Sequence, residues 1–336
     1  SRRYLNPLYL RIEEVPGAAH AGLDLEALGT AGRALNGVRQ IDRDAVFRLK
    51  TAALERLWVR FPGDPGFERY CDEQGKGLGE FATFCALAES HGPSWRAWPV
   101  EYRRPDAPAV ARFAVDQAAR VRFHQWLQWL LDLQFARAAA GIRLIPDLPI
   151  GVHPDGADAW AWQDVLAQGV SIGSPPDSFN TQGQDWGLPP FIPHRLRAAA
   201  YAPFVQTIRA ALRHAGGLRI DHIMGFFRLF WIPWGTLPVD GTYVRYPARD
   251  LLAIVALESR RAGAVIVGED LGTVEPGVRE ELAARQILST RLLWFEPEPP
   301  ARYPRMALAA VTTHDLPTIA GLWSGTATTW VNLNPA

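Results

Sequence analysis

Three acidic residues follow short apolar runs that predict buried strands. Asp221 comes after GLRI, Glu269 after AVIVG, and Asp315 after ALAAVTTH. Arg219 lies two positions before Asp221, so on a strand both side chains share one face and the guanidinium keeps the carboxylate ionised. The apolar run before Glu269 is expected to raise its pKa. One ionised carboxylate beside one protonated carboxyl is the pair that glycosidic-bond chemistry requires.

Other interpretations of these carboxylates stay open at this point. Arg219 and Asp221 also fit a buried structural ion pair about equally well. A divalent-metal site is a further alternative, but Arg219 would repel a hard cation and no DxD-type spacing recurs. Asp270 directly follows Glu269 and would point to the opposite strand face, so we interpret it as structural. A GxSxG serine nucleophile motif is absent from the sequence.

The composition narrows the class of protein. The chain has 336 residues, 48% of them hydrophobic, with zero formal net charge and a pI of about 7.1. This balance argues against nucleic-acid binding and against a membrane-surface protein. The two cysteines, Cys71 and Cys85, form no disulfide framework and fit a reducing cytosol, and no apolar run is long enough to span a membrane. We therefore expect a cytoplasmic protein; its oligomeric state is not indicated.

A repeated unit of helix, glycine, apolar run and polar residue organises the second part of the chain. Non-alternating apolar runs are typical of parallel strands buried on both faces, and glycine after a helix is typical of a left-handed cap. Charged groups at several strand ends favour a (β/α)8 barrel, with an open doubly wound sheet as the rival. Helices are predicted at 42–60, 67–91, 115–140, 202–215, 248–262 and 276–285, and strands at 142–145, 217–220, 264–268, 290–296 and 307–311.

The same pattern predicts the domain organisation. Residues 1–109 are expected to form a mostly helical subdomain, inserted in or preceding the barrel, and residues 110–325 the barrel units. Residues 157–200 hold too much glycine and proline for regular structure and predict a long rim loop. Asp177, Gln184 and Trp186 in that loop could hold a polar ring-shaped ligand, although the residues alone slightly favour an ordered surface loop held in place by Trp186.

Several motifs in a fixed order resemble the amylomaltases, the 4-α-glucanotransferases of glycoside hydrolase family 77 in the α-amylase superfamily. The similarity extends to about Gly325. The motifs that carry it are GLRIDH at 217–222, GEDLG at 268–272, THD at 313–315, DLPI at 147–150, ADAWA at 157–161, PPD at 175–177, GQDWG at 183–187, WP at 98–99 and NPL at 6–8.

The resemblance implies a role for each matching residue. Asp221 would be the nucleophile, Glu269 the general acid and then the base, and Asp315 would hold sugar hydroxyls and stabilise the transition state. The configuration at the anomeric carbon would be retained, with the two reacting carboxyl groups about 5–5.5 Å apart. The implied substrates are α-1,4-glucans and maltooligosaccharides, without metal or organic cofactor. The residues expected to contact or orient the substrate are Arg219, His222, His314, Asp147, Asp177, Gln184 and Trp186.

The sequence also departs from that family pattern. Family members carry further barrel strands, and we expect this chain to lack the first and the last barrel units and therefore to form an incomplete (β/α)8 barrel. The tail 326–336 matches nothing expected after the Asp315 motif. We expect a fragment that exposes strand edges and is poorly soluble or inactive alone. An α-1,4-glucan hydrolase with the same three carboxylates, or an inactive glucan-binding remnant, remains the alternative.

Overall fold

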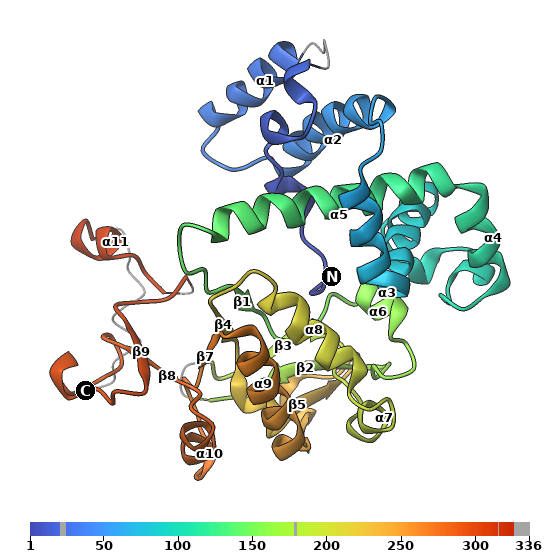
Figure 1. Cartoon of the computed structure of the whole chain (residues 1–336). Coiled ribbons are helices and arrows are strands. Elements are labelled where there is room, and N and C mark those ends of the chain that lie inside the picture. Colours follow the sequence, from blue (N-terminus) through green and yellow to red (C-terminus); the bar gives the residue numbers. More distant parts are fainter. Residues whose placement is uncertain (21–24, 178–179, 315, 326–336) are drawn as a thin grey trace. The chain divides into compact units, whose positions relative to one another are not determined.

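The computed structural model describes residues 1–20, 25–177, 180–314 and 316–325, and the chain divides into two compact units. Unit 1 comprises residues 1–142 and 155–163, and unit 2 the remaining segments (Figure 1). The predicted tail 326–336 lies outside the described residues. Within the described ranges, no helix combines the length and the apolar character needed to cross a membrane.

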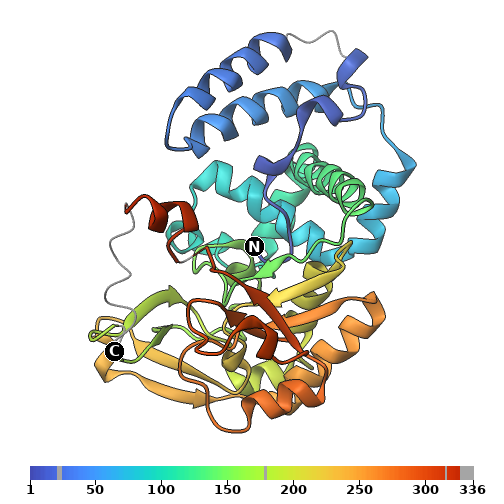
Figure 2. The ribbon, with the colours of Figure 1, turned by 90° about the vertical axis from the view of Figure 1, so that its left-hand side faces the viewer.

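Unit 1 is helical. The helices α1 and α2 lie side by side in both views of the ribbon (Figures 1 and 2). The side chain of Asp42 accepts a hydrogen bond from the amide of Ala45 and so begins α2. The α-helices are α1 (Leu25–Ala34), α2 (Arg43–Val59), α3 (Pro65–His91), α4 (Pro108–Asp116), α5 (Ala118–Ala139) and α6 (Ala157–Ala161).

The core of unit 1 is aromatic and joins α3 to α5. Phe67 of α3 and both Phe123 and Trp126 of α5 are almost fully buried. Because this packing ties the long helix α5 to α3, the helical unit continues to residue 142, beyond the predicted boundary at 109. Residues 155–163 return to the same unit, with Trp160 buried against Phe84.

Unit 2 contains a parallel sheet in the order β1-β4-β7, and a parallel pair β8-β9. An isolated parallel bridge from Val267 to Leu288 links β7 to the start of β8. The strands are β1 (Asp147–Leu148), β4 (Gly217–Ile220), β7 (Val265–Gly268), β8 (Ser289–Leu292) and β9 (Ala307–Ala310). The helices of this unit are α7 (Pro193–Ala198), α8 (Ala202–Leu212), α9 (Ala248–Ala262), α10 (Val278–Ala284) and α11 (Ile319–Trp323).

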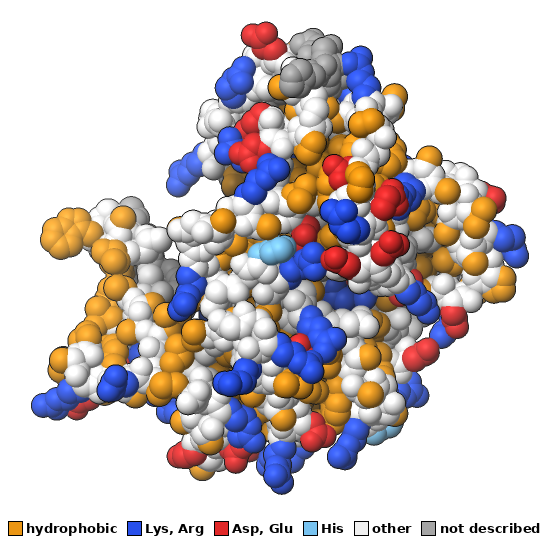
Figure 3. Space-filling model, viewed as in Figure 1, with side chains coloured by type: hydrophobic (Ala, Val, Ile, Leu, Met, Phe, Trp, Pro, Cys, Tyr) orange, Lys and Arg blue, Asp and Glu red, His pale blue; other side chains and the backbone are white. Residues whose placement is uncertain are grey.

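The apolar core of unit 2 lies between the parallel strands and helices α8, α9 and α10. Leu218 of β4, Ile208 of α8 and Val255 of α9 are fully buried in this core. The observed α9 has the predicted bounds, and Gly263 ends it in the left-handed conformation, at φ 64°. The packing is sparser at β8, β9 and α11, where apolar side chains are exposed (Figure 3): Leu293, Phe295, Met306, Leu308, Val311, Ile319 and Trp323.

The first strand differs from its predicted position at 142–145. Ladder hydrogen bonds already reach the carbonyls of Leu144 and Pro146, which accept from Gly217 and Arg219 respectively. Pro146 has no N–H to return a bond, so regular pairing is assigned only at Asp147–Leu148. The strand is therefore short, and its end still reaches the sheet edge that carries Asp147.

An antiparallel sheet in the order β3-β2-β5-β6 was not foreseen. Its strands are β2 (Val170–Ser174), β3 (Gln184–Leu188), β5 (Arg228–Pro233) and β6 (Thr242–Arg245). The predicted rim loop at 157–200 therefore contains two strands and two short helices, α6 and α7. The close approach of β3 explains why residue 173 is a glycine, because a Cβ there would lie 2.0 Å from the carbonyl oxygen of Gln184. Glycine thus permits the close approach of the two strands.

Candidate active site

Asp221 and Glu269 stand side by side at the carboxyl edge of the parallel sheet. Ile220 and Gly268 are register partners on β4 and β7, so the two acidic residues occupy the next position on each strand. The ladder continues through them: the amide of Asp221 donates to the carbonyl of Leu148 at 3.0 Å, and that of Glu269 to Ile220 at 2.9 Å. Because in-register residues of adjacent strands share a face, both carboxyl groups belong to one side of the sheet edge.

Arg219 is shared between two carboxylates. Its Nη1 lies 2.7 Å from both carboxyl oxygens of Asp147 and 3.0 Å from Oδ1 of Asp221. Asp147 is also its register partner on β1, so the contact crosses between adjacent strands. The Arg219 side chain is only 16% exposed, which strengthens its interaction with both anions. The three predicted residues are therefore brought together, with Arg219 in the middle.

Glu269 has an environment unlike that of Asp221. It is 8% exposed, its Oε1 accepts from the amide of Leu271 at 2.7 Å, and its Oε2 accepts from the amide of His222 at 2.8 Å. Burial raises the pKa of Glu269, and the nearby Asp221 anion adds to that increase, while the two amides and Arg219 oppose it. The carboxyl group is thus positioned by the backbone and biased toward carrying a proton.

His222 connects this edge to the antiparallel sheet. Its ring meets Trp186 of β3 edge to face, with the ring centroids 5.5 Å apart, and Trp186 Nε1 donates to Gln184 Oε1 at 2.9 Å. Burial lowers the pKa of His222 despite the opposing charge of Asp221, so the imidazole is neutral at pH 7. The unforeseen strand β3 is therefore the element that brings Trp186 against His222.

Three predicted residues remain, namely Asp177, His314 and Asp315. Asp177 closes a turn, in which its carboxylate accepts from the amide of Asn180 at 2.6 Å. His314 is exposed and follows β9, at the same edge as the other strand ends. Asp315 lies outside the described residues.

Asp270 is fully buried and held by neighbouring groups. Its carboxylate accepts from Nε of Arg279 and from the amide of Thr290, both at 2.8 Å, and Nη1 of Arg291 lies 3.6 Å away. These contacts join the end of β7 to α10 and β8, in keeping with the structural interpretation of this residue. Among the described residues, no group of three His, Cys, Asp or Glu side chains is arranged to hold a metal ion.

Sequence reasoning missed three groups that organise the site. The amides of His222 and Leu271 carry no signature in a sequence, because backbone direction depends on φ and ψ. Glu275, in the loop after Glu269, lies 3.2 Å from Arg228 and 3.4 Å from Arg245. The two arginines follow no motif, and only the unforeseen pairing of β5 with β6 brings them together.

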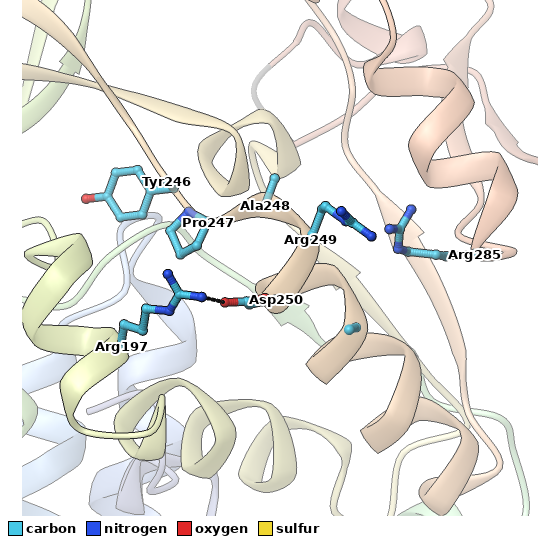
Figure 4. A pocket seen from close by; sticks show the side chains of 8 residues that line it. Arg197, Tyr246, Pro247, Ala248, Arg249, Asp250 and Arg285 are labelled. Atoms are coloured by element: carbon cyan, nitrogen blue, oxygen red, sulfur yellow. Dashed lines mark ion pairs between the residues drawn. The ribbon is translucent and has the colours of Figure 1, made fainter.

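A separate cavity of about 740 Å³ lies at the beginning of α9 (Figure 4). None of the predicted site residues lines it. Two of its arginines have acidic partners: Arg197 lies 3.6 Å from Asp250, and Arg285 pairs with Glu281 at 2.5 Å. The lining residues are Arg197, Tyr246, Pro247, Ala248, Arg249, Asp250, Ala253 and Arg285. The cavity is therefore not the place where the paired carboxylates would act.

The fold and the cluster define an α/β protein with paired carboxylates at the carboxyl edge of a parallel sheet. Residues 1–333 match the model of glycoside hydrolase family 77, described as 4-alpha-glucanotransferase. The chain therefore belongs to this family.

Individual relatives agree with that assignment. The 4-alpha-glucanotransferase of Mycobacterium tuberculosis is 50% identical over 353 residues, covering 97% of this chain and 48% of that protein. That of Haemophilus influenzae is 34% identical, covering 96% of this chain and 51% of that protein. The chain thus spans about half the length of these relatives.

Two solved structures resemble the fold. Amylomaltase from Corynebacterium glutamicum matches with a TM-score of 0.81 and 37% identity, over 97% of this chain and 47% of that one. Amylomaltase from Streptococcus agalactiae, solved in complex with acarbose, gives the same TM-score at 20% identity, over 97% of this chain and 70% of that one. The mixed α/β architecture is therefore that of amylomaltases.

Proposed function

We propose that the full-length protein is a 4-α-glucanotransferase that moves α-1,4-glucan segments between maltooligosaccharides. The observation that carries this proposal is the pair of unlike carboxyl groups in register on β4 and β7. Asp221 is one-third exposed and paired with Arg219, whereas Glu269 is buried and has a raised pKa. Membership of the family supports the same activity.

The chemistry follows from this division of roles. An oxygen of Asp221 attacks the anomeric carbon while the bond from that carbon to the glycosidic oxygen breaks. Glu269 gives its proton to the departing oxygen, leaving a glucosyl–Asp221 ester. Glu269, now a carboxylate, then removes the proton from a hydroxyl of the incoming sugar. The oxygen of that hydroxyl attacks the anomeric carbon and releases Asp221, so two inversions retain the configuration.

Arg219 and Asp147 would set the charge of the nucleophile. Arg219 compensates Asp221 in the free enzyme, and Asp147 competes for the same guanidinium at 2.7 Å. When Asp221 becomes a neutral ester, Arg219 still has an anionic partner in Asp147. This arrangement limits the electrostatic cost of forming the covalent intermediate.

The sugar chain would lie across the edge formed by β4, β7 and β3. Trp186 offers an aromatic face, with Gln184, Asp177, His222, His314 and Asp315 proposed as the polar groups around the sugar rings. The parallel strands β1, β4, β7, β8 and β9 would form part of a (β/α)8 barrel. Their common direction and the intervening helices α8, α9 and α10 support this assignment.

Disproportionation of maltotriose tests the function. The full-length protein should convert it into glucose and a ladder of longer maltooligosaccharides, separated by chromatography. The variant E269Q should lose several orders of magnitude in turnover, because it cannot protonate the leaving oxygen. Shortening of maltotriose without longer products would instead identify a hydrolase, and full activity of E269Q would refute the assignment of Glu269.

A further inference from the structure

The peptide group between Asp221 and His222 links the two carboxyl residues. Its N–H donates to Oε2 of Glu269 at 2.8 Å, and its carbonyl carbon belongs to Asp221. The next amide, of Ile223, donates to the carbonyl oxygen of the same Glu269 at 3.0 Å. Two consecutive N–H groups of the turn after β4 therefore bind one residue, holding its side chain and its backbone together.

This double contact occurs where the backbone is left-handed. His222 has φ 47° and ψ 57°, a conformation that a residue with a Cβ adopts only at a cost of about 1–2 kcal/mol. Such strain persists where surrounding contacts enforce it, and it is frequent at functional sites. Here the enforcing contacts are the two hydrogen bonds to Glu269, together with the bond from the amide of Gly225 to the carbonyl of His222 at 2.8 Å.

The strand opposite makes room for the turn. A Cβ at residue 268 would lie 2.7 Å from Cδ1 and 3.0 Å from Cγ2 of Ile223, whose side chain is fully buried. Those separations are shorter than van der Waals contact, so an alanine at 268 would have to push Ile223 away. The absence of a side chain on Gly268 therefore lets the end of β7 pack closely against the turn after β4.

We infer that the left-handed backbone of His222 is a positioning device that fixes the carboxyl group of Glu269 relative to Asp221. This inference deepens the proposed function and rests on it, because it concerns the same two carboxyl groups. His222 acts in this respect through its amide, independently of its imidazole. The device sets both the place of the proton donor and, by donating to the charged form, the pH at which that donor ionises.

Four substitutions at residue 222 separate the backbone from the imidazole, since all four remove the ring. Glycine and asparagine adopt the left-handed region readily, alanine at a cost of about 1–2 kcal/mol, and valine scarcely at all. H222G, H222N and H222A should agree within about threefold in kcat. The kcat of H222V should be about tenfold lower than that of H222A, with little change in KM, because the proton donor is misplaced in the transition state.

The pH profile is the readout that a merely structural role would not move. When the amide of residue 222 no longer donates to Glu269, an interaction that lowers the pKa of Glu269 is lost. The alkaline limb of the kcat/KM profile should therefore move to higher pH in H222V and stay in place in H222G and H222N, relative to H222A. Equal kcat and equal limbs in all four variants would overturn the inference, leaving the imidazole as the only contribution of the residue.

A second set of three variants keeps the inference testable if H222V does not fold. G268A should displace Ile223 and the turn, and lower kcat about tenfold with the same shift of the alkaline limb. I223V removes Cδ1, the atom nearest to the added Cβ. The kcat of G268A/I223V should therefore lie close to that of I223V alone, so that most of the loss caused by G268A is recovered. Unchanged activity of G268A, or failure of the double variant to recover, would contradict this close packing.

A titration without substrate separates this inference from the proposed function. The ionisation of Glu269 can be followed by infrared difference spectroscopy, with E269Q identifying its band. If the protein transfers no sugar, the proposed function fails, yet a higher pKa of Glu269 in H222V than in H222A would still support the positioning device. Identical Glu269 pKa values in these two variants would refute it whatever the activity.

Discussion

Glu269 lies at the balance of two opposing effects. Burial favours its neutral form, while the amides of His222 and Leu271 favour its anion. Burial prevails, so the pKa is raised above the ordinary glutamate value of about 4.3. The residue can therefore remain protonated at a pH above that ordinary value, while the more exposed Asp221 lies against Arg219.

This balance predicts a pH dependence. The first chemical step needs protonated Glu269, so activity should fall as pH rises through its raised pKa, giving an alkaline limb above about pH 4.3. Because the folded pKa exceeds the unfolded one, the stability contributed by protonated Glu269 is complete below about pH 4.3 and is lost as pH rises. Denaturant unfolding should show that the free energy of unfolding of the wild type falls relative to that of E269Q as pH rises above about 4.3. A pH-independent difference would contradict the prediction.

Asp270 permits a test of stability apart from chemistry. It is fully buried and bonded to Arg279 and to the amide of Thr290. Removing the carboxylate in D270A leaves these donors without an acceptor and should lower the free energy of unfolding by about 3 kcal/mol. Urea denaturation measures the loss. D116A, at the exposed last residue of α4, is the matched control and should change stability by less than about 0.5 kcal/mol.

At the scale of elements, two like charges face each other across β5 and β6. Arg228 and Arg245 are register partners, an arrangement that is destabilising without a counter-charge. Glu275 supplies it at 3.2 and 3.4 Å, and Arg228 also lies over the ring of Tyr243 at 3.9 Å. Since Glu275 belongs to the loop that begins with Glu269, this ion pair ties the proton donor's loop to the antiparallel sheet.

The variant E275Q should loosen that loop. The two arginines would then repel each other, so kcat should fall about threefold to tenfold while the overall fold persists. E298Q is the control, because Glu298 pairs with Arg302 on the surface and such pairs contribute little. Steady-state kinetics and hydrogen exchange of the loop measure the effect. Equal kinetics of E275Q and E298Q would show that the anchor is not needed.

Helices α3 and α5 of unit 1 are joined by a second titrating link. Burial tends to raise the pKa of Glu89, but His124 and Arg120 outweigh it and hold the pKa at about 2. The folded value lies below the unfolded one of about 4.3, so this stability is present above that pH and is lost as pH falls toward 2.

A pH series on E89Q tests the link. The variant should be less stable than wild type at about pH 6, and the difference should shrink as pH is lowered toward about pH 2. Urea unfolding monitored by circular dichroism gives both values. A difference that stays constant across this range would mean that Glu89 contributes through packing rather than through charge.

Elements with local signals could be predicted, and those with long-range pairing could not. The strand Gly217–Ile220 and the helix Ala248–Ala262 have the predicted bounds, because apolar runs and a glycine cap define them locally. The strand Gln184–Leu188 is largely exposed and carries few apolar residues, so its sequence alone predicted a loop. It is a strand because β2 lies beside it, a partner that periodicity does not reveal.

The candidate site follows the same division. The shared face of Arg219 and Asp221 follows from the two-residue period of a strand, and the structure gives the contact at 3.0 Å. The contact of Arg219 with Asp147 depends on strand order, and that of His222 with Glu269 depends on a left-handed residue. Neither could be derived from residue types. The third carboxylate, Asp315, lies outside the described residues.

At the scale of the whole molecule, the chain covers about half the length of its curated relatives. Its parallel strands nevertheless bring Asp147, Arg219, Asp221 and Glu269 to one edge. The amino-acid positions that would break and form the sugar ester are thus assembled within unit 2 alone.

Residues 1–3 are hydrogen-bonded to Asp158, which is more than 150 positions later in the sequence. The buried carboxylate of Asp158 accepts from the hydroxyl of Ser1 and from Nε of Arg3, both at 3.0 Å, and Arg3 lies over the ring of Trp162. A ribosome must therefore translate the strand β1 of the other unit before the opening residues can reach their partner. Nascent chains released short of residue 158 would leave Arg3 without this anion. Only longer nascent chains, from which that segment has emerged, should gain resistance to protease.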